Sequence, residues 1–149
     1  VDCNALVNDV LADLGSAISE TQTKIEITGT LPVINAYRTE LKQVFQNLII
    51  NAIKFRKKDA IPHIKVLSQK KDGFWQFTVS DNGIGIDPKH NEKIFVIFQR
   101  LHTREEYEGS GIGLSHCRKI AELHKGKIWV DSAPGKGSAF HFTIHQSLS

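Results

Sequence analysis

Apolar and polar residues follow two different periods along this chain, and each period marks a different kind of element. Apolar residues that recur every three or four positions predict amphipathic helices, whereas alternation of apolar and polar residues predicts strands with one buried face. The helical period covers residues 4–14, 39–56 and 111–124, and part of 88–98. Strands are predicted over residues 24–28, 33–36, 63–69, 74–80, 127–131 and 138–145.

Turn-forming residues separate these elements and indicate the fold class. Lys71-Asp72-Gly73 predicts a hairpin between two of the strands, and residues 133–137 predict a second hairpin near the end of the chain. Helices and strands mix without strict β-α-β alternation, which favours an α+β fold. We expect a two-layer α/β sandwich, with helices packed on one face of a mixed, mostly antiparallel sheet of about five strands.

The helix predicted over residues 39–56 is apolar around most of its circumference, which is typical of a buried helix. A narrow polar stripe interrupts it within an arc of about 80°. The stripe consists of Gln43, Asn47, Asn51 and Lys54. An unpartnered buried amide costs about 1–3 kcal/mol, so a polar ligand should face the stripe, and amide oxygens suit Mg²⁺. For an isolated helix, a solvent-exposed stripe is the commoner explanation.

Asp81 follows the strand predicted over residues 74–80, at the end of an inward-facing apolar row. Alternation places on one face of the strand Trp75, Phe77, Val79 and Asp81. A buried carboxylate needs a hydrogen-bond donor, and the exocyclic amine of adenine is one. The glycines Gly83 and Gly85 suit close approach of the backbone to a flat base. Asp-Asn-Gly is, however, also an ordinary turn sequence.

A glycine-rich string, Gly109-Ser110-Gly111-Ile112-Gly113-Leu114, leads into the helix predicted over residues 111–124. Free backbone N–H groups and the positive end of the helix dipole make such a junction a natural phosphate site. The spacing departs from the dinucleotide fingerprint, and the sequence has no GxxxxGK[ST] loop. Gly135-Lys136-Gly137 is better explained as a hairpin turn.

The composition is that of an ordinary globular protein, and it does not indicate a particular function. The chain has 149 residues, of which 40% are hydrophobic and 23% charged, and we expect residues 1–149 to form one domain. The net charge of +3 falls short of a nucleic-acid-binding signature. Cys3 and Cys117 lack metal-ligand spacing, which favours a reducing compartment, and no apolar run is long enough to span a membrane. The lack of methionine indicates a fragment of a longer protein.

Four segments in a fixed order resemble the motifs of the ATP-binding catalytic domain of bacterial-type histidine kinases, in the superfamily of gyrase, Hsp90 and MutL ATPases. Residues 47–55 resemble the N box of that family, 81–86 the G1 box, 94–100 the F box and 109–114 the G2 box. The stretch 93–113 is most similar to the phytochrome-type and PAS-linked branch. The resemblance implies a Bergerat-type ATP-binding fold, with ATP and Mg²⁺ as cofactors.

The resemblance also implies roles for individual residues. Asn51 would coordinate Mg²⁺, and Asn47 would assist metal and phosphate binding. Lys54 and Arg100 would meet the phosphates and, with Asn51, form the catalytic set, while Asp81 would recognise adenine. The polar loop 99–109 would be a mobile lid. The implied nucleotide-binding set is Asn47, Asn51, Lys54, Phe55, Asp81, Gly83, Gly85, Ile86, Phe98, Arg100, Gly109, Ser110, Gly111, Ile112, Gly113 and Leu114.

The implied function is donation of the ATP γ-phosphate to a histidine on a separate dimerisation domain, followed by relay to the receiver domain of a response regulator. The sequence has seven histidines, but none has the neighbours of the family's phosphoacceptor, so the acceptor domain should lie outside this chain. The fragment alone should bind nucleotide without completing autophosphorylation. We expect a cytoplasmic, monomeric domain of a homodimeric parent, without nucleic acid or direct membrane contact.

Three alternatives stay open. An ATPase of the gyrase or Hsp90 kind carries a glutamate one helical turn before the metal-binding asparagine, where this chain has Asn47, and an amide is a poor general base. Hydrolysis is disfavoured for that reason. A serine kinase of the anti-sigma type would share the nucleotide site. A non-catalytic nucleotide-sensing module would regulate a neighbouring domain by closing its lid.

Overall fold

The computed structural model describes residues 1–87, 93–95 and 112–145. Its helices are α1 (Cys3–Asp13), α2 (Gly15–Thr21), α3 (Arg38–Lys54) and α4 (Ile112–Leu123), with a 3-10 turn, η2, over Lys93–Phe95. Its strands are β1 (Lys24–Ile27), β2 (His63–Lys71), β3 (Phe74–Asp81), β4 (Ile128–Ser132) and β5 (Ser138–His145). Within this part of the chain, no helix is both long enough and apolar enough to cross a membrane.

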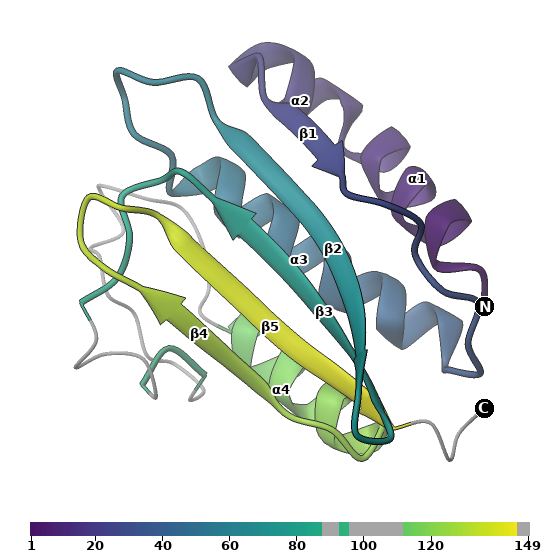
Figure 1. Ribbon diagram of the computed structural model, residues 1–149. Coiled ribbons are helices and arrows are strands. Elements are labelled where there is room, and N and C mark those ends of the chain that lie inside the picture. Colours follow the sequence, from purple (N-terminus) through teal and green to yellow (C-terminus); the bar gives the residue numbers. More distant parts are fainter. Residues whose placement is uncertain (88–92, 96–111, 146–149) are drawn as a thin grey trace.

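The strands of the described residues form one five-stranded sheet in the order β1-β2-β3-β5-β4. β1 pairs in parallel with β2, and the remaining neighbours are antiparallel. The helices lie on one face of the sheet, with α3 and α4 behind its strands (Figure 1). The predicted α+β sandwich with a mixed, mostly antiparallel sheet is therefore confirmed. The predicted β2–β3 hairpin is present too, with left-handed backbone at Asp72 and Gly73, as a two-residue turn requires.

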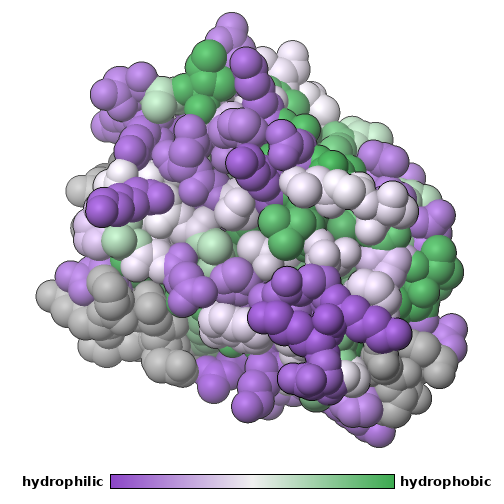
Figure 2. All heavy atoms as spheres, in the orientation of Figure 1, coloured by the Kyte–Doolittle hydropathy of each residue, from purple (hydrophilic) through white to green (hydrophobic). Residues whose placement is uncertain are grey.

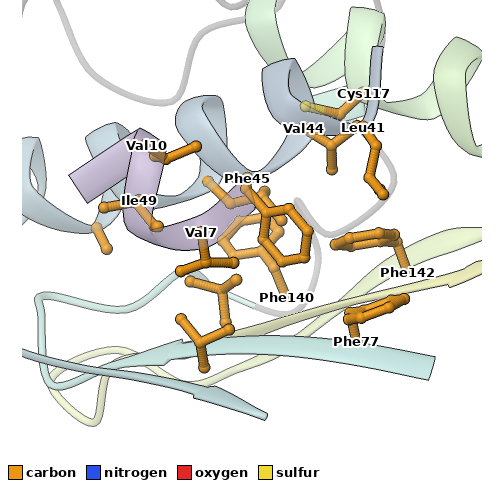
Figure 3. Packing of buried hydrophobic residues seen from close by; sticks show 14 of the residues in the cluster. Val7, Val10, Leu41, Val44, Phe45, Ile49, Phe77, Cys117, Phe140 and Phe142 are labelled. Carbon is orange, nitrogen blue, oxygen red and sulfur yellow. The ribbon is translucent and has the colours of Figure 1, made fainter. Parts of the chain in front are cut away.

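The core lies between α3 and the inner face of the sheet. Alternate residues of β5 are buried, among them Phe140, Phe142 and Ile144. Phe45 projects from α3 toward Phe77 of β3 and Phe142 of β5, with ring centroids 5.5 and 5.2 Å away (Figure 3). Edge-to-face aromatic pairs of this kind stabilise a core beyond their buried area. The cluster fixes α3 against the two strands that lead to and from the candidate site.

Near the N-terminus, the helix predicted over residues 4–14 is present as α1, but one helix was not predicted and one predicted strand is wrong. The unpredicted helix is α2, which begins at Gly15 and is terminated by Gln22 in left-handed conformation. Residues 33–36 form no strand, because their partner segment is too short: Asp2 bridges Val33, and α1 begins at the next residue. The Asp2 side chain accepts the N–H groups of Asn4 and Ala5 and so caps that helix.

The outer face of the sheet carries a polar and aromatic cluster that the alternation pattern did not predict. His141 alternates with the buried residues of β5 and so lies on this face, where it stacks on Trp129 and bonds Thr78 and Asp131. Thr78 and its neighbour Gln76 are buried beneath these rings. Figure 2 views the molecule from this side, where hydrophilic and hydrophobic residues are interspersed.

His124 joins the last turn of α4 to the first turn of α3. Its Nδ1–H donates to the Ile120 carbonyl at 2.8 Å, since a carbonyl can only accept. Its Nε2 therefore accepts the N–H of Tyr37, at 3.0 Å. His124 is fully buried, and the Tyr37 ring packs edge-on against it. Both ring nitrogens are thus used to connect the two helices.

We expect His124→Phe to lower the free energy of unfolding by about 1–3 kcal/mol, because it leaves the Tyr37 N–H without an acceptor while keeping a ring of similar size. Urea denaturation of both proteins measures this difference. The matched control is His63→Phe, at an exposed position of β2, which should change stability by at most about 0.5 kcal/mol. Equal losses in the two variants would contradict a connecting role for His124.

Candidate functional site

Those of the predicted site residues that the structure describes lie near the end of the sheet where β3 and β4 end and β5 begins (Figure 1). The C-terminal end of α3 reaches the same region: the Phe55 carbonyl accepts the N–H of Ile84 in the loop after β3. The first turn of α4 contacts α3, because the Asn47 side chain bonds the Gly113 carbonyl. Three parts of the chain that are distant in sequence therefore form one site.

The Asp81 carboxylate ends the inner row of β3, where alternation placed it. Its Oδ1 accepts two backbone N–H groups, from Gly83 at 2.8 Å and from Ser138 at 3.3 Å. Its Oδ2 makes no hydrogen bond with the residues that the structure describes. One oxygen therefore holds the carboxylate in place, and the other is available to a ligand.

Burial dominates the electrostatics of this group. Desolvation raises the pKa of Asp81 from 3.8 to about 6, and the hydrogen bonds from Gly83 and Ser138 act in the opposite direction. Placing the carboxylate in a partly dry environment makes its ionised form expensive. A hydrogen-bond donor on a ligand would offset that cost.

The loop after Asp81 is packed so closely that its glycines cannot be replaced without movement. A Cβ at Gly83 would lie 2.5 Å from the Phe55 carbonyl oxygen. Gly85 has a φ of +76°, and a Cβ there would overlap the backbone of Ala133. The Gly135 N–H also donates to the Ile84 carbonyl, at 2.6 Å. Glycine is therefore required here by close approach to α3 and to the β4–β5 hairpin, whereas the expectation from the sequence is close approach to a base.

The polar stripe of α3 divides into two kinds of group. Gln43 bonds His116, and Asn47 directs its Nδ2 toward the Gly113 carbonyl and the Cys117 sulfur, at 3.4 and 3.6 Å. Asn51 and Lys54, by contrast, have no side-chain hydrogen bond or ion pair to the part of the chain described. Asn51 is half-buried and Lys54 is exposed. The end of the stripe nearest Phe55 is therefore the part open to a ligand.

This donor set fits a magnesium ion that is shared with a ligand. The Asn51 amide is half-buried without a partner among the described residues, and Asn47 has its nitrogen turned to α4, which leaves its oxygen for another contact. Mg²⁺ takes few protein oxygens and keeps waters or phosphate oxygens as its remaining ligands. Buried Cys117 does not compete for this role, because burial raises the pKa of its thiol to about 12.

Five of the predicted site residues lie outside the described ranges: Phe98, Arg100, Gly109, Ser110 and Gly111. The predicted lid over residues 99–109 lies outside them as well. Ile112 begins α4, in agreement with a glycine string that leads into a helix, and Leu114 packs against the core. Phe55 and Ile86 are both half-buried at the site.

Two serines were missed by sequence reasoning. Ser138 donates its backbone N–H to Asp81, and the Ser132 hydroxyl accepts the N–H of Ile86 at 2.7 Å. The two hydroxyls are 2.8 Å apart. A serine in a strand carries no distinctive local pattern. The available signal was the position of Ser138 directly after the predicted Gly135–Gly137 turn, which brings it back toward β3.

Comparison with known proteins identifies similar chains. The family model for "Histidine kinase-, DNA gyrase B-, and HSP90-like ATPase" matches residues 36–148. Phytochrome-like protein Cph1 of Synechocystis sp. is 51% identical over 143 residues, which cover 96% of this chain but 19% of that protein. This chain therefore spans about a fifth of the length of that curated relative.

Solved structures share the fold. The catalytic domain of the histidine kinase ThkA, in a nucleotide-free form, superposes with a TM-score of 0.81 at 32% identity and covers 98% of this chain and 93% of its own. A structure of ThkA in complex with the response regulator protein TrrA gives a TM-score of 0.77 at 28% identity and covers 99% of this chain and 41% of its own. The similarity extends over nearly the whole chain.

The raised pKa of Asp81 predicts a pH-dependent stability. The folded state binds this proton more tightly than the unfolded chain, so the contribution of Asp81 is favourable below about pH 4 and is lost as the pH rises through about 6. The Asp81→Asn variant has no titrating group at that position. Its stability relative to wild type should therefore grow between pH 4 and pH 7, by roughly 1–3 kcal/mol. Urea denaturation at a series of pH values measures this difference.

Asp59→Asn, at an exposed position, provides the control, since its stability relative to wild type should stay constant over the same pH range. A constant difference for Asp81→Asn as well would mean that Asp81 is not desolvated in the folded protein.

Proposed function

This chain belongs to the family of histidine kinase-, DNA gyrase B- and HSP90-like ATPases, and on that premise we propose that it is the ATP-binding catalytic domain of a sensor histidine kinase. It binds Mg-ATP and presents the γ-phosphate to a histidine on a separate dimerisation domain, from which a response regulator receives the phosphoryl group. The observation that carries the proposal is the half-buried Asp81 carboxylate, with one oxygen fixed by backbone N–H groups and the other without a partner among the described residues.

Asp81 provides the adenine end of the proposed site. A carboxylate that is already held in position accepts the exocyclic amine without losing further side-chain freedom, and the interaction offsets its desolvation. The close-packed Gly83 and Gly85 keep the loop backbone close to Phe55 and Ala133. The loop therefore forms a preorganised wall for the base.

Asn51, Asn47 and Lys54 provide the phosphate end. Asn51 and Asn47 would hold the Mg²⁺ ion, which neutralises phosphate charge and orients the phosphates when bound. Lys54 is exposed, and its ammonium group would pair with a phosphate as a point charge. We assign Arg100 and the Gly109–Ser110–Gly111–Ile112–Gly113–Leu114 string to the same end, with Phe98 anchoring the lid.

Asn47 favours transfer over hydrolysis. It lies one helical turn before Asn51, where a water-activating enzyme needs a base, and an amide cannot accept a proton at neutral pH. Its nitrogen also bonds α4, so the side chain supports the contact between the two helices. Catalysis in this site then rests on positioning and charge neutralisation.

The proposed partners follow from the same chemistry. A domain that does not carry its own phosphoacceptor needs a histidine-bearing domain, and the ThkA complex with TrrA shows that a structurally similar kinase assembles with a response regulator. We place the domain in the cytoplasm, as part of a homodimeric parent. Transfer of labelled phosphate from ATP to a supplied histidine-bearing domain tests the reaction directly, and a serine acceptor in its place tests the anti-sigma-type alternative.

Asp81→Asn should weaken ADP binding by about 1.5–3 kcal/mol, because it replaces an acceptor of a charge-assisted hydrogen bond with a neutral amide. Isothermal titration calorimetry with the 149-residue chain at about pH 8, where the carboxylate is ionised, measures the change. Asp131→Asn is the matched control, since this exposed carboxylate pairs with His141 on the outer face of the sheet. Unchanged ADP affinity in the Asp81 variant would remove the basis of the proposal.

Asn51→Ala should reduce the dependence of ADP affinity on Mg²⁺ by about tenfold, because the chain loses an oxygen ligand to the metal. Titrations of ADP with Mg²⁺ or with EDTA measure it. Gln43→Ala is the control on the same stripe, since Gln43 bonds His116 and should not affect the metal. Phosphate transfer to the supplied histidine domain should be lost in the Asn51 variant alone. A full Mg²⁺ effect in that variant would show that the ion is held elsewhere.

A further inference from the structure

Three polar residues form a row across the end of the sheet. Asp81 of β3 lies directly opposite Ser138 of β5, and Ser138 lies directly opposite Ser132 of β4. Residues opposed in this way share one face of the sheet, with Cβ atoms about 4.5–5.5 Å apart. Asp81 belongs to the inner row of β3, so both serine hydroxyls project to the side of the candidate site.

The partners of Ser132 determine the direction of each hydrogen bond in this row. Its Oγ lies 2.7 Å from the Ile86 nitrogen, 2.9 Å from the Gly137 carbonyl oxygen and 2.8 Å from the Ser138 hydroxyl. A hydroxyl has one hydrogen and two lone pairs. The Ile86 N–H can only donate and the Gly137 carbonyl can only accept. The Ser132 hydrogen therefore goes to Gly137, and its remaining lone pair accepts the hydrogen of Ser138.

Because the Ser138 hydroxyl donates its only hydrogen to Ser132, it can only accept a hydrogen bond from any further partner. The ionised Asp81 carboxylate is also an acceptor only, and its Oδ2 has no partner in the described part of the chain. Asp81 and Ser138 together therefore present acceptors and no donor. Such a pair suits an amino group, which brings two hydrogens, and it repels a carbonyl oxygen, which brings none.

We propose that Ser132 is a positioning residue that sets this all-acceptor character, and that it thereby makes the site prefer an exocyclic amine of a purine over a carbonyl oxygen at the same ring position. Ser132 acts through Ser138 and through the Ile86 N–H, and it does not itself contact the base. The inference rests on the proposed nucleotide site. It adds a second cause for discrimination between adenine and hypoxanthine, beside the Asp81 carboxylate, which is itself an acceptor only.

Without the Ser132 hydroxyl, Ser138 regains a free hydrogen. It can then rotate and donate to the carbonyl oxygen of hypoxanthine, while adenine loses a fixed acceptor. The affinity for ADP should fall and the affinity for IDP should fall less or rise. The ratio of the two affinities is therefore the informative quantity, because a general loosening of the β4–β5 hairpin would weaken both nucleotides alike.

The test compares Ser132→Thr with Ser132→Val in the 149-residue chain, since threonine and valine have the same shape and differ by the hydroxyl. Calorimetry with ADP and with IDP at about pH 8 gives both affinities while the carboxylate is ionised. Wild type and Ser132→Thr should prefer ADP by about tenfold or more, and Ser132→Val should lose about fivefold to tenfold of that preference. Ser132→Ala is the second variant without a hydroxyl, and it should match Ser132→Val.

Three results separate the possible failures. An ADP-to-IDP ratio that is unchanged in both hydroxyl-free variants overturns the role of Ser132, even if both affinities fall. A lowered ratio that Ser132→Thr does not restore overturns it as well, because the effect would then come from shape. Lack of ADP binding by the wild-type chain overturns the proposed function itself, and the ratio then has no meaning.

Discussion

The candidate site depends on one constraint. A carboxylate must be able to ionise although it lies at the end of the buried apolar face of β3, where little water reaches it. Asp81 meets this constraint because two backbone N–H groups hold one of its oxygens. These donors come from opposite sides, one from the loop that follows the residue and one from the neighbouring strand β5. The positions of these two N–H donors depend on close backbone contacts at Gly83, Gly85 and Gly137, where there is no room for a side chain. A single charged group thus explains why the surrounding backbone is packed so tightly.

The polar groups of α3 show how a buried helix can serve both the fold and a ligand. The residues nearer its start, Gln43 and Asn47, are bonded to α4, so they contribute to the packing of the two helices. The residues nearer its end, Asn51 and Lys54, have no such bond within the described ranges. Both groups lie on the same stripe, and only the position along the helix distinguishes them. Along the stripe, side chains that bond α4 are therefore followed, within about two helical turns, by side chains that have no such bond in the described part of the chain.

Hydrophobic periodicity and turn sequences predicted those elements whose structure depends mainly on neighbouring residues in the sequence. The helix around Asn47 and Asn51, the hairpin at Asp72-Gly73 and the inward position of Asp81 follow from periodicity and turn chemistry. Two details of the N-terminal region did not follow: α2 begins at Gly15 despite the low helix propensity of glycine, and Val33 pairs with a single residue instead of forming a strand. Ser132 and Ser138 could not be found from the sequence either. Their contact depends on the register of β3, β5 and β4, and a period of two cannot specify which strands become neighbours.

The His124–Tyr37 connection has a mechanical consequence for how the two helices can separate. The two antiparallel helices are joined where α3 begins and α4 ends, so this junction acts as a pivot between them. Asn51 lies about 21 Å along α3 from the pivot, at 1.5 Å per residue. A relative rotation of the two helices by about 5° would change their separation near Asn51 by roughly 2 Å and leave Tyr37 in place. Because the core aromatics hold α3 on the sheet, such a tilt would move α4 away from α3 near Asn51. It would break the contact between the Asn47 side chain and the Gly113 carbonyl, while every turn of both helices stays intact.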